Sequence, residues 1–194
     1  ADDIFTAVRI AKEFKLDYVL VHCTDGHLIA DELAQENACA VVGPVMCDAC
    51  KPELANITPK NAGVLAQSGV KTAVCTDHSE TPIQYLTLTV GICIKHGLDL
   101  QSAVDSITIN AAEIYAKWLA QATGYEYIET PKASISEIVK YEEIILCGGI
   151  YASGIAGLGF LKKNYSRLSN KRTAVFCVGA SPFDQKAFEE LRAF

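Results

Sequence analysis

The sequence predicts an α/β protein in which about six parallel strands alternate with helices. Several short runs of β-branched residues are apolar throughout, which is typical of parallel strands that helices cover on both faces. The segments between these runs repeat their apolar residues at the spacing of a helix. Half of the 194 residues are hydrophobic and 21% are charged, so the composition favours a folded core over disorder.

The strands are expected at the β-branched runs and the helices between them. The predicted strands are residues 17–23, 39–45, 70–76, 125–129, 143–148 and 173–179. The predicted helices are residues 4–15, 28–36, 61–68, 82–96, 100–107, 111–123, 135–141, 156–168 and 184–194. Gly69 and Gly124 follow two of these helices and act as stop signals. The segment 82–96 is apolar nearly all round, which predicts a buried helix.

The charge and the apolar runs exclude several classes of partner. The net charge of −6 argues against binding to nucleic acid or to an anionic membrane surface. The longest apolar stretch, residues 83–94, contains Gln84, Thr87 and Thr89 and is too short and too polar to span a bilayer. No basic and apolar leader opens the chain, so a cytoplasmic location is expected. The chain does not begin with Met, so we expect its start to have been processed, trimmed or engineered.

Most of the eight cysteines lie inside apolar runs, as Cys75, Cys147 and Cys177 do. Such cysteines behave as small hydrophobic residues, so reduced and buried thiols are expected. Cys47 and Cys50 form a lone C-x-x-C pair, which supplies too few ligands for zinc. A redox pair is the alternative to a chance spacing.

The ends of two predicted strands carry residues that can bind a metal. Strand 17–23 ends around His22, and strand 70–76 is followed by Asp77. In an α/β fold, ligands gather where strands end and helices begin. A His and an Asp there are natural ligands for a divalent metal that activates water, although each can equally be an ordinary polar loop residue.

Residues 2–114 resemble the C-terminal half of a metal-dependent amidohydrolase of the imidazolonepropionase-like group. The resemblance rests on the stretches DDIFTAVRIAKEF, VHCTDGHLIADEL, TDH, PIQYLTLTVGICIKHGL and TINAAEIY. It implies part of a (β/α)8 barrel and a divalent metal such as zinc. His22 would be a metal ligand at the sixth strand of the barrel. Asp77 would be the eighth-strand aspartate, which binds metal and takes a proton from the attacking water.

The same family needs further metal ligands that this sequence does not carry. These are an early H-x-H motif, a bridging group from the fourth strand and a His on the fifth strand. Two ligands do not hold a catalytic metal. Hydrolysis of an amide or cyclic amide by this chain alone is therefore not expected, and a partner chain would have to complete the site.

Two glycine-rich stretches follow strands in the last third of the chain. They are CGGIYASG at residues 147–154 and VGASPFD at residues 178–184. Small residues allow backbone amides to approach a flat ring or an anion closely. The alternative is two tight strand-to-helix turns, which need glycine without any ligand.

Residues 116–194 resemble a flavodoxin-like domain of the type related to oxygen-independent protoporphyrinogen oxidase. The matching stretches are AKWLAQATGYEYIE, YEEIILCGGIYASGIAGLGFLKKNY, TAVFCVGASPFD and KAFEELR. The resemblance implies contacts to the ring of FMN from two loops. The residues concerned are Gly149, Ile150, Tyr151 and Ala152 on one side of the ring and Gly179, Ala180 and Ser181 on the other. The phosphate-binding loop of the family is missing, so FMN binding is expected to be weak or absent.

The two resemblances meet inside a helix near residues 114–117, without a linker. This predicts a chimera of an amidohydrolase-like half-barrel, residues 1–115, and a flavodoxin-like fragment, residues 116–194. The halves either merge into one α/β domain, with strand 70–76 replacing the central flavodoxin strand, or leave open sheet edges that close in a homo-oligomer. The leading hypothesis is a recombined fold without evolved activity. The alternatives are an FMN-binding electron-transfer module and a metal-dependent amidohydrolase completed by a partner chain.

Overall fold

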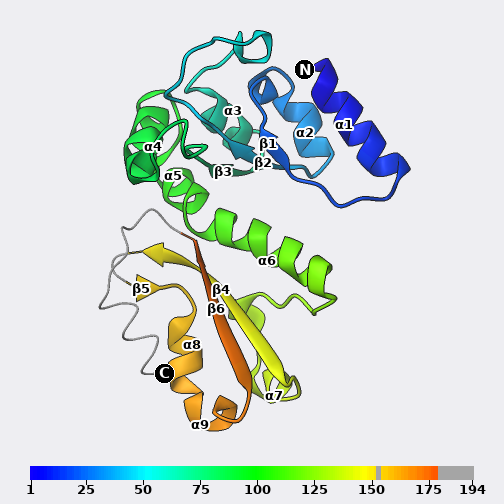
Figure 1. Cartoon of the computed structure of the whole chain (residues 1–194), viewed down its shortest axis with the longest axis vertical. Coiled ribbons are helices and arrows are strands. Elements are labelled where there is room, and N and C mark those ends of the chain that lie inside the picture. The colour runs from blue at the N-terminus through cyan, green and yellow to red at the C-terminus, as the bar shows by residue number, and fades with distance from the viewer. Residues whose placement is uncertain (152–153, 179–194) are drawn as a thin grey trace. The chain divides into compact units, whose positions relative to one another are not determined.

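The chain is an α/β protein, and its computed structural model describes residues 1–151 and 154–178. The chain divides into two compact units, Ala1–Ala111 and Ala112–Phe194 (Figure 1). The division falls inside one helix, slightly before the boundary at residue 115 that the sequence suggests. None of the described helices has the length and apolar character that crossing a membrane requires.

The first unit is built on a three-stranded parallel sheet in the order β1-β2-β3. The strands are β1 (Leu20–His22), β2 (Cys39–Val42) and β3 (Lys71–Val74). The pairs Val21↔Val41 and Val41↔Ala73 fix their register. Because all three strands run in the same direction, their carboxyl ends meet at one edge of the sheet. The sheet is open, so the described strands form no closed barrel.

The helices of the first unit follow the predicted alternation closely. They are α1 (Asp2–Glu13), α2 (Ala30–Gln35), α3 (Asn61–Gln67), α4 (Leu86–Lys95) and α5 (Leu100–Ser106), with single 3-10 turns η1 (Gly26–Leu28), η2 (Pro52–Leu54) and η3 (Ile83–Tyr85). Helix α3 contacts both β3 and α2. The most deeply buried side chains of the unit include Leu33, Leu65 and Cys93, one each from α2, α3 and α4.

The segment 82–96 differs from its prediction as a helix buried on all sides. A 3-10 turn comes first, and the helix begins only at Leu86. Only one face of α4 is buried, through Leu86, Thr89, Val90 and Cys93. Leu88 and Ile94 of this helix are exposed, and so is Ile83 of the preceding 3-10 turn. Apolar composition alone could not show which neighbours exist to cover the other face.

The second unit holds a sheet in the order β5-β4-β6. Helix α6 (Ile109–Thr123) crosses the division between the units. It is followed by η4 (Thr130–Lys132), α7 (Ile135–Ile138), β4 (Glu143–Tyr151), β5 (Gly154–Ile155), α8 (Leu158–Lys163), α9 (Tyr165–Leu168) and β6 (Arg172–Val178). Strands β4 and β6 run parallel from Glu143↔Arg172 to Gly149↔Val178. Strand β5 is antiparallel to β4, a short hairpin that the sequence did not predict.

The core of the second unit lies between the β4–β6 ladder and helices α8 and α9. Leu146, Leu158, Leu161 and Leu168 are its buried members, and Val175 is one of the partly buried residues around them. The predicted helix 156–168 is interrupted at Asn164, which ends α8 and precedes α9. The side-chain amide of Asn164 donates to the carbonyl oxygen of Phe160 at 2.8 Å, which satisfies an acceptor at this break.

One sequence prediction about strands is wrong in the described part of the chain. Residues 125–129 form no ladder with any described strand, although their composition favours a strand. The error concerns the partner of a strand, which local composition does not specify. The described strands divide between two sheets, in the orders β1-β2-β3 and β5-β4-β6. The predicted helix 184–194 lies outside the described residues.

Candidate functional site

His22 ends β1 at the carboxyl edge of the first sheet. Its Nδ1 lies 2.6 Å from the carbonyl oxygen of Gly43 at the end of β2. A carbonyl oxygen only accepts hydrogen bonds, so Nδ1 donates in this contact, and in the neutral ring the lone pair lies on Nε2. Metal-binding histidines are commonly held in this way by a backbone carbonyl. His22 therefore has the tautomer of a ligand.

Asp77 follows β3 at the same edge of the sheet, and its side chain is exposed. The backbone at His22 has a φ of 65° and that at Asp77 a φ of 51°, so both lie in the left-handed region. Cys23, next to His22, shares this conformation with a φ of 44°. Such backbone is uncommon for residues other than glycine and is often found at functional sites.

The sheet order separates these two candidate ligands. Strand β2 lies between β1 and β3, so the strand axes that carry His22 and Asp77 are roughly 10 Å apart. No group of three or more His, Cys, Asp or Glu side chains in the described part of the chain is placed to hold a metal ion. The structure thus brings both predicted residues to one edge without assembling a complete metal site around them.

A small cavity of about 10 Å³ lies beside His22, close to the size that holds one water molecule. Thr24, Gly43, Thr58 and Asn61 are among its lining residues. The cavity is far smaller than the clefts that bind small-molecule substrates. It does not provide a substrate site.

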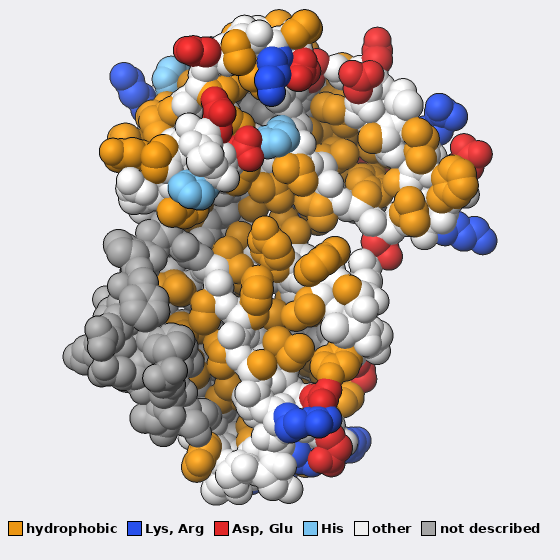
Figure 2. All heavy atoms as spheres, viewed as in Figure 1, with side chains coloured by type: hydrophobic (Ala, Val, Ile, Leu, Met, Phe, Trp, Pro, Cys, Tyr) orange, Lys and Arg blue, Asp and Glu red, His pale blue; other side chains and the backbone are white. Residues whose placement is uncertain are grey.

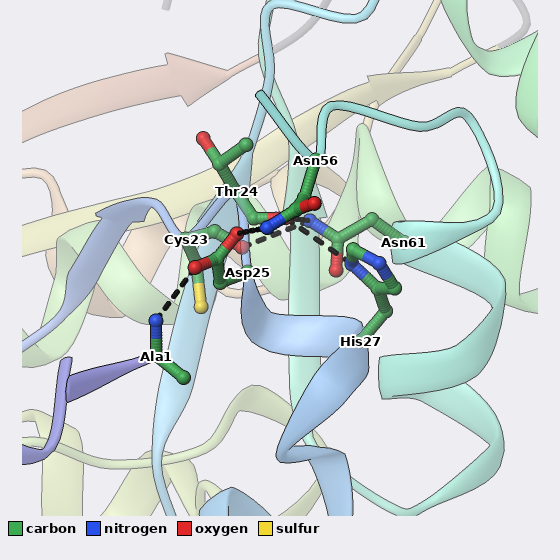
Figure 3. A network of polar contacts seen from close by, with 7 residues as sticks. All are labelled: Ala1, Cys23, Thr24, Asp25, His27, Asn56 and Asn61. Atoms are coloured by element: carbon green, nitrogen blue, oxygen red, sulfur yellow. Dashed lines mark hydrogen bonds and ion pairs between the residues drawn. The ribbon is translucent and has the colours of Figure 1, made fainter. Parts of the chain in front are cut away.

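Asn61 organises the exit of β1, although no sequence motif singled it out. It is 3% exposed at the start of α3, and its Nδ2 donates to the carbonyl oxygens of Cys23 at 2.8 Å and Thr24 at 3.3 Å (Figure 3). Its Oδ1 has no hydrogen-bond partner among the described residues. These contacts join segments 38 and 37 residues apart. The only local signal of its role was its position as the first residue of a predicted helix.

Asp25 forms a second polar centre in the same loop (Figure 3). Its carboxylate accepts from the amino group of Ala1 at 2.6 Å and from Nδ2 of Asn56 at 3.1 Å. The hydrogen bond from Ala1 is the main cause that lowers the pKa of Asp25. Nδ1 of His27 lies 3.2 Å from the carbonyl oxygen of Thr24. Asp25 and His27 are thus engaged in holding the loop.

The C-x-x-C pair lies in the loop after β2. Cys47 is half-buried and Cys50 is exposed, and both are free thiols. The hydroxyl of Thr81 donates to the carbonyl oxygen of Met46 at 3.1 Å, which ties this loop to the one after β3. Burial, and then the nearby Glu80 carboxylate, raises the pKa of Cys47. A raised pKa disfavours the thiolate that redox exchange requires.

The second candidate site, at the carboxyl edge of the β4–β6 ladder, differs from its prediction as two loops. Gly149, Ile150 and Tyr151 belong to β4, and Ile150 and Tyr151 pair with β5. A Cβ at Gly148 would lie 2.2 Å from the carbonyl oxygen of Ala156, so glycine there permits the chain to fold back closely. Ala152, Gly179, Ala180 and Ser181 lie outside the described residues.

The pairing nevertheless places parts of the two glycine-rich stretches side by side. Gly149 of the first stretch pairs with Val178, the first residue of the second, at the end of the parallel ladder. Neighbouring strands in a sheet are about 4.8 Å apart. A flat ligand at this edge would lie beside Gly148 and Gly149 of β4 and Val178 of β6.

Comparisons with known proteins support both resemblances. A family model described as a flavodoxin domain matches residues 111–194. The crystal structure of an amidohydrolase from Thermotoga maritima is similar to this chain, with 33% sequence identity and a TM-score of 0.57. The similarity covers 59% of this chain and 30% of that amidohydrolase, so the chain spans under a third of the length of this relative. A comparison with curated proteins finds no match.

Proposed function

We propose that this chain is a recombined α/β chimera that keeps remnants of an amidohydrolase metal site and of a flavodoxin FMN site, without catalytic turnover of its own. One observation carries the proposal. The edge of the first sheet presents His22 and Asp77 on strands that flank β2, and no third ligand from the described residues joins them. Two ligands bind a divalent metal weakly and leave it mobile.

The residues present do not fit a resident catalytic metal. A divalent ion in a complete amidohydrolase site would activate water for attack on an amide carbon. In this chain His22 offers Nε2 and Asp77 a carboxylate from an exposed loop. Asp25, the acidic residue nearest to His22 in sequence, is already engaged with Ala1 and Asn56. We therefore derive no reaction step through a metal.

The test is zinc content together with hydrolysis. After dialysis against zinc and then buffer, we expect well under one zinc per chain and no hydrolysis of cyclic amides above background. The variants His22→Ala and Asp77→Asn should give the same result as the parent chain. One zinc per chain that both variants lose, with hydrolysis lost alongside it, would instead support an amidohydrolase. If this binding appears only in an oligomer, a partner chain completes the site.

Flavin binding by the second unit is the second candidate, because the register of β4 and β6 supports it. The ladder ends at Gly149↔Val178, where the two stretches with small residues begin. Small residues at this edge, such as Gly149, can approach the ring of FMN. Helix α8 begins at Leu158 directly after Gly157, but it is only six residues long, so its N-terminus is a weak site for the phosphate. We therefore expect FMN affinity weaker than micromolar.

An FMN titration followed by flavin fluorescence tests this candidate. Quenching should saturate only well above the micromolar range. The variant Tyr151→Ala should weaken it further, because stacking on an aromatic ring contributes roughly 1–3 kcal/mol. The variant Tyr85→Ala, at an exposed tyrosine of the first unit, is the matched control and should leave the titration unchanged. Equal effects of both variants would count against a site at the end of β4.

A further inference from the structure

Strand β4 has an open edge over part of its length. On one side it pairs with β6 from Glu143 to Gly149. On the other side its partner is β5, which reaches only Ile150 and Tyr151, and the amide of Ala156 donates to the carbonyl oxygen of Gly149 at 2.9 Å. In the described part of the chain, residues 143–147 therefore have no backbone partner on the side away from β6.

This open edge has the character of an interior strand. Leu146 is buried, and Ile144, Ile145 and Cys147 are each partly buried. Edge strands of soluble proteins are usually guarded by a charge, a proline or a bulge. Residues 144–147 carry no charge and no proline, and their register with β6 is continuous. These properties are typical of a strand that has a neighbour on both sides.

A second observation comes from residues 125–129, which form no ladder with any described strand in spite of their two tyrosines and isoleucine. Their backbone contacts to described residues are local, from the amide of Tyr125 to Oγ1 of Thr123 at 3.4 Å and from the amide of Lys132 to the carbonyl oxygen of Glu129 at 2.9 Å. Side chains make the longer-range contacts. The hydroxyl of Tyr141 donates to the carboxylate of Glu126, and the ammonium of Lys117 lies 5.6 Å from the ring centre of Tyr127. The segment is followed by α7 and then β4. Strand–helix–strand units of this kind are parallel, and their strands are often separated by another strand.

We propose that residues 143–147 of β4 accept an extended strand from a partner chain, parallel to β4, and that residues 125–129 pair with the far side of that strand. One inserted strand then explains both an open edge and a strand-forming segment without a ladder. Each flank offers about five residues, so the partner segment needs an apolar run of that length. Main-chain hydrogen bonds supply most of the affinity in such strand addition.

Charge specifies the chemistry of the partner further. Glu126 and Glu137 lie near the Tyr141 hydroxyl, at the start of β4. Glu142 and Glu143 are already paired with Lys171 and Arg172. In a parallel arrangement the amino end of the partner strand reaches the Glu126 side of the opening. A Lys or Arg immediately before the apolar run therefore complements the site.

The experiment measures backbone amide exchange by NMR in the full chain, with a synthetic peptide as the probe. The peptide is acetyl-Lys-Thr-Val-Ile-Val-Thr-Val-amide. We expect it, at up to roughly millimolar concentration, to slow exchange about tenfold or more at alternate amides in both 143–147 and 125–129. Amides of β2 in the first unit are the control and should not change. No slowing at any concentration, or slowing confined to β6, would overturn the proposal.

Two N-methylated peptides distinguish insertion from simple edge addition. In one peptide the amides along one edge are methylated, and in the other those along the opposite edge. An inserted strand uses both of its edges, so each methylated peptide should fail to slow exchange. A peptide added to a single edge would tolerate one of the two patterns, and that result would contradict pairing with residues 125–129. Replacing the Lys of the probe by Glu should weaken its effect several-fold, because Glu126 and Glu137 face that end.

Discussion

The two sheets of this chain differ in how completely their strands are covered. In the first sheet, β2 has a neighbour on each side, Ala40 is fully buried, and Ala73 and Val74 of β3 are buried as well. In the second sheet, β6 has one described neighbour and is exposed from Arg172 to Ala174, and the Phe176 ring is 39% exposed. Both sheets are made of β-branched, apolar strands. Strand order, more than composition, therefore decides which apolar residues are buried.

Figure 2 shows the consequence at the surface, where hydrophobic side chains extend over much of the visible face of the second unit. Tyr115 and Trp118 of α6 and Phe176 of β6 are among its exposed apolar residues. The buried core of this unit depends on a few leucines on the opposite side of the ladder. Among the described residues, the first unit has the larger buried core, and each of its α-helices contributes to it. We expect the two units to differ in stability and to unfold separately.

The variants with the largest expected effect each remove one core leucine, one variant for each unit. Leu33→Ala and Leu161→Ala delete side chains that are 0% and 2% exposed. Each should destabilise its own unit by about 2–5 kcal/mol, because a cavity remains. Circular dichroism follows both units, whereas the fluorescence of Trp118, the single tryptophan, follows α6 and the second unit. Leu161→Ala should shift the fluorescence transition and Leu33→Ala should not. Equal shifts from both variants would mean that the chain is one cooperative domain.

The sequence predicted the elements well wherever a strand finds its partner within the same unit. β1, β2 and β3 lie inside the predicted runs, and β4 and β6 lie close to theirs. The run 125–129 has equal strand character but no described partner, so pairing fails there. His22 and Asp77 were placed at strand ends correctly, because parallel strands share a carboxyl edge. Asn61 was missed, since its two acceptors are distant in sequence and only folding brings them together.

Alkaline pH should destabilise the first unit more than the second, where burial raises the pKa values of Cys147 and Cys177 less strongly. Burial raises the pKa of Cys23 and of Cys93 from 9.0 to about 11. Between these values the unfolded chain loses a proton that the folded chain retains, so rising pH favours unfolding. The stabilisation that each raised thiol pKa adds to the free energy of unfolding is fully present below pH 9.0. Above that pH it falls by about 1.4 kcal/mol per pH unit for each thiol until the folded pKa is reached. Urea unfolding at a series of pH values measures the slope.

The control for this pH dependence is the double variant Cys23→Ala/Cys93→Ala. It should reduce the slope between pH 9.0 and about 11 in the circular dichroism transition, and the remainder would come from groups such as Cys75 and Cys47, whose pKa values burial also raises. An unchanged slope in the double variant would show that lysines and tyrosines, rather than these two thiols, cause the alkaline loss.

A smaller effect is expected from Asn61, which holds the exit of β1. Asn61→Ala removes this donor from the buried carbonyl oxygen of Cys23, which keeps its bond from the Gly26 amide, so the variant should cost about 0.5–1.5 kcal/mol. Asn56→Ala removes a comparable amide from the exposed contact to Asp25 and should change stability by less than about 0.5 kcal/mol. Urea unfolding monitored by circular dichroism compares the two. Similar losses of unfolding free energy in both variants would mean that the buried hydrogen bonds of Asn61 stabilise the unit no more than the exposed contact of Asn56.

The smallest effect concerns an aromatic pair between α6 and β6. The rings of Tyr115 and Phe176 have centroids 5.7 Å apart and are tilted by 46°. Such pairs contribute about 0.5–1.5 kcal/mol beyond burial, and both rings here are substantially exposed, which favours the lower end. Tyr115→Leu, Phe176→Leu and the double variant form a cycle that isolates this coupling in the fluorescence transition. A coupling near zero would mean that α6 is not fastened to β6 through this pair. The second unit would then depend on its leucine core alone, and its contrast with the first unit would be sharper still.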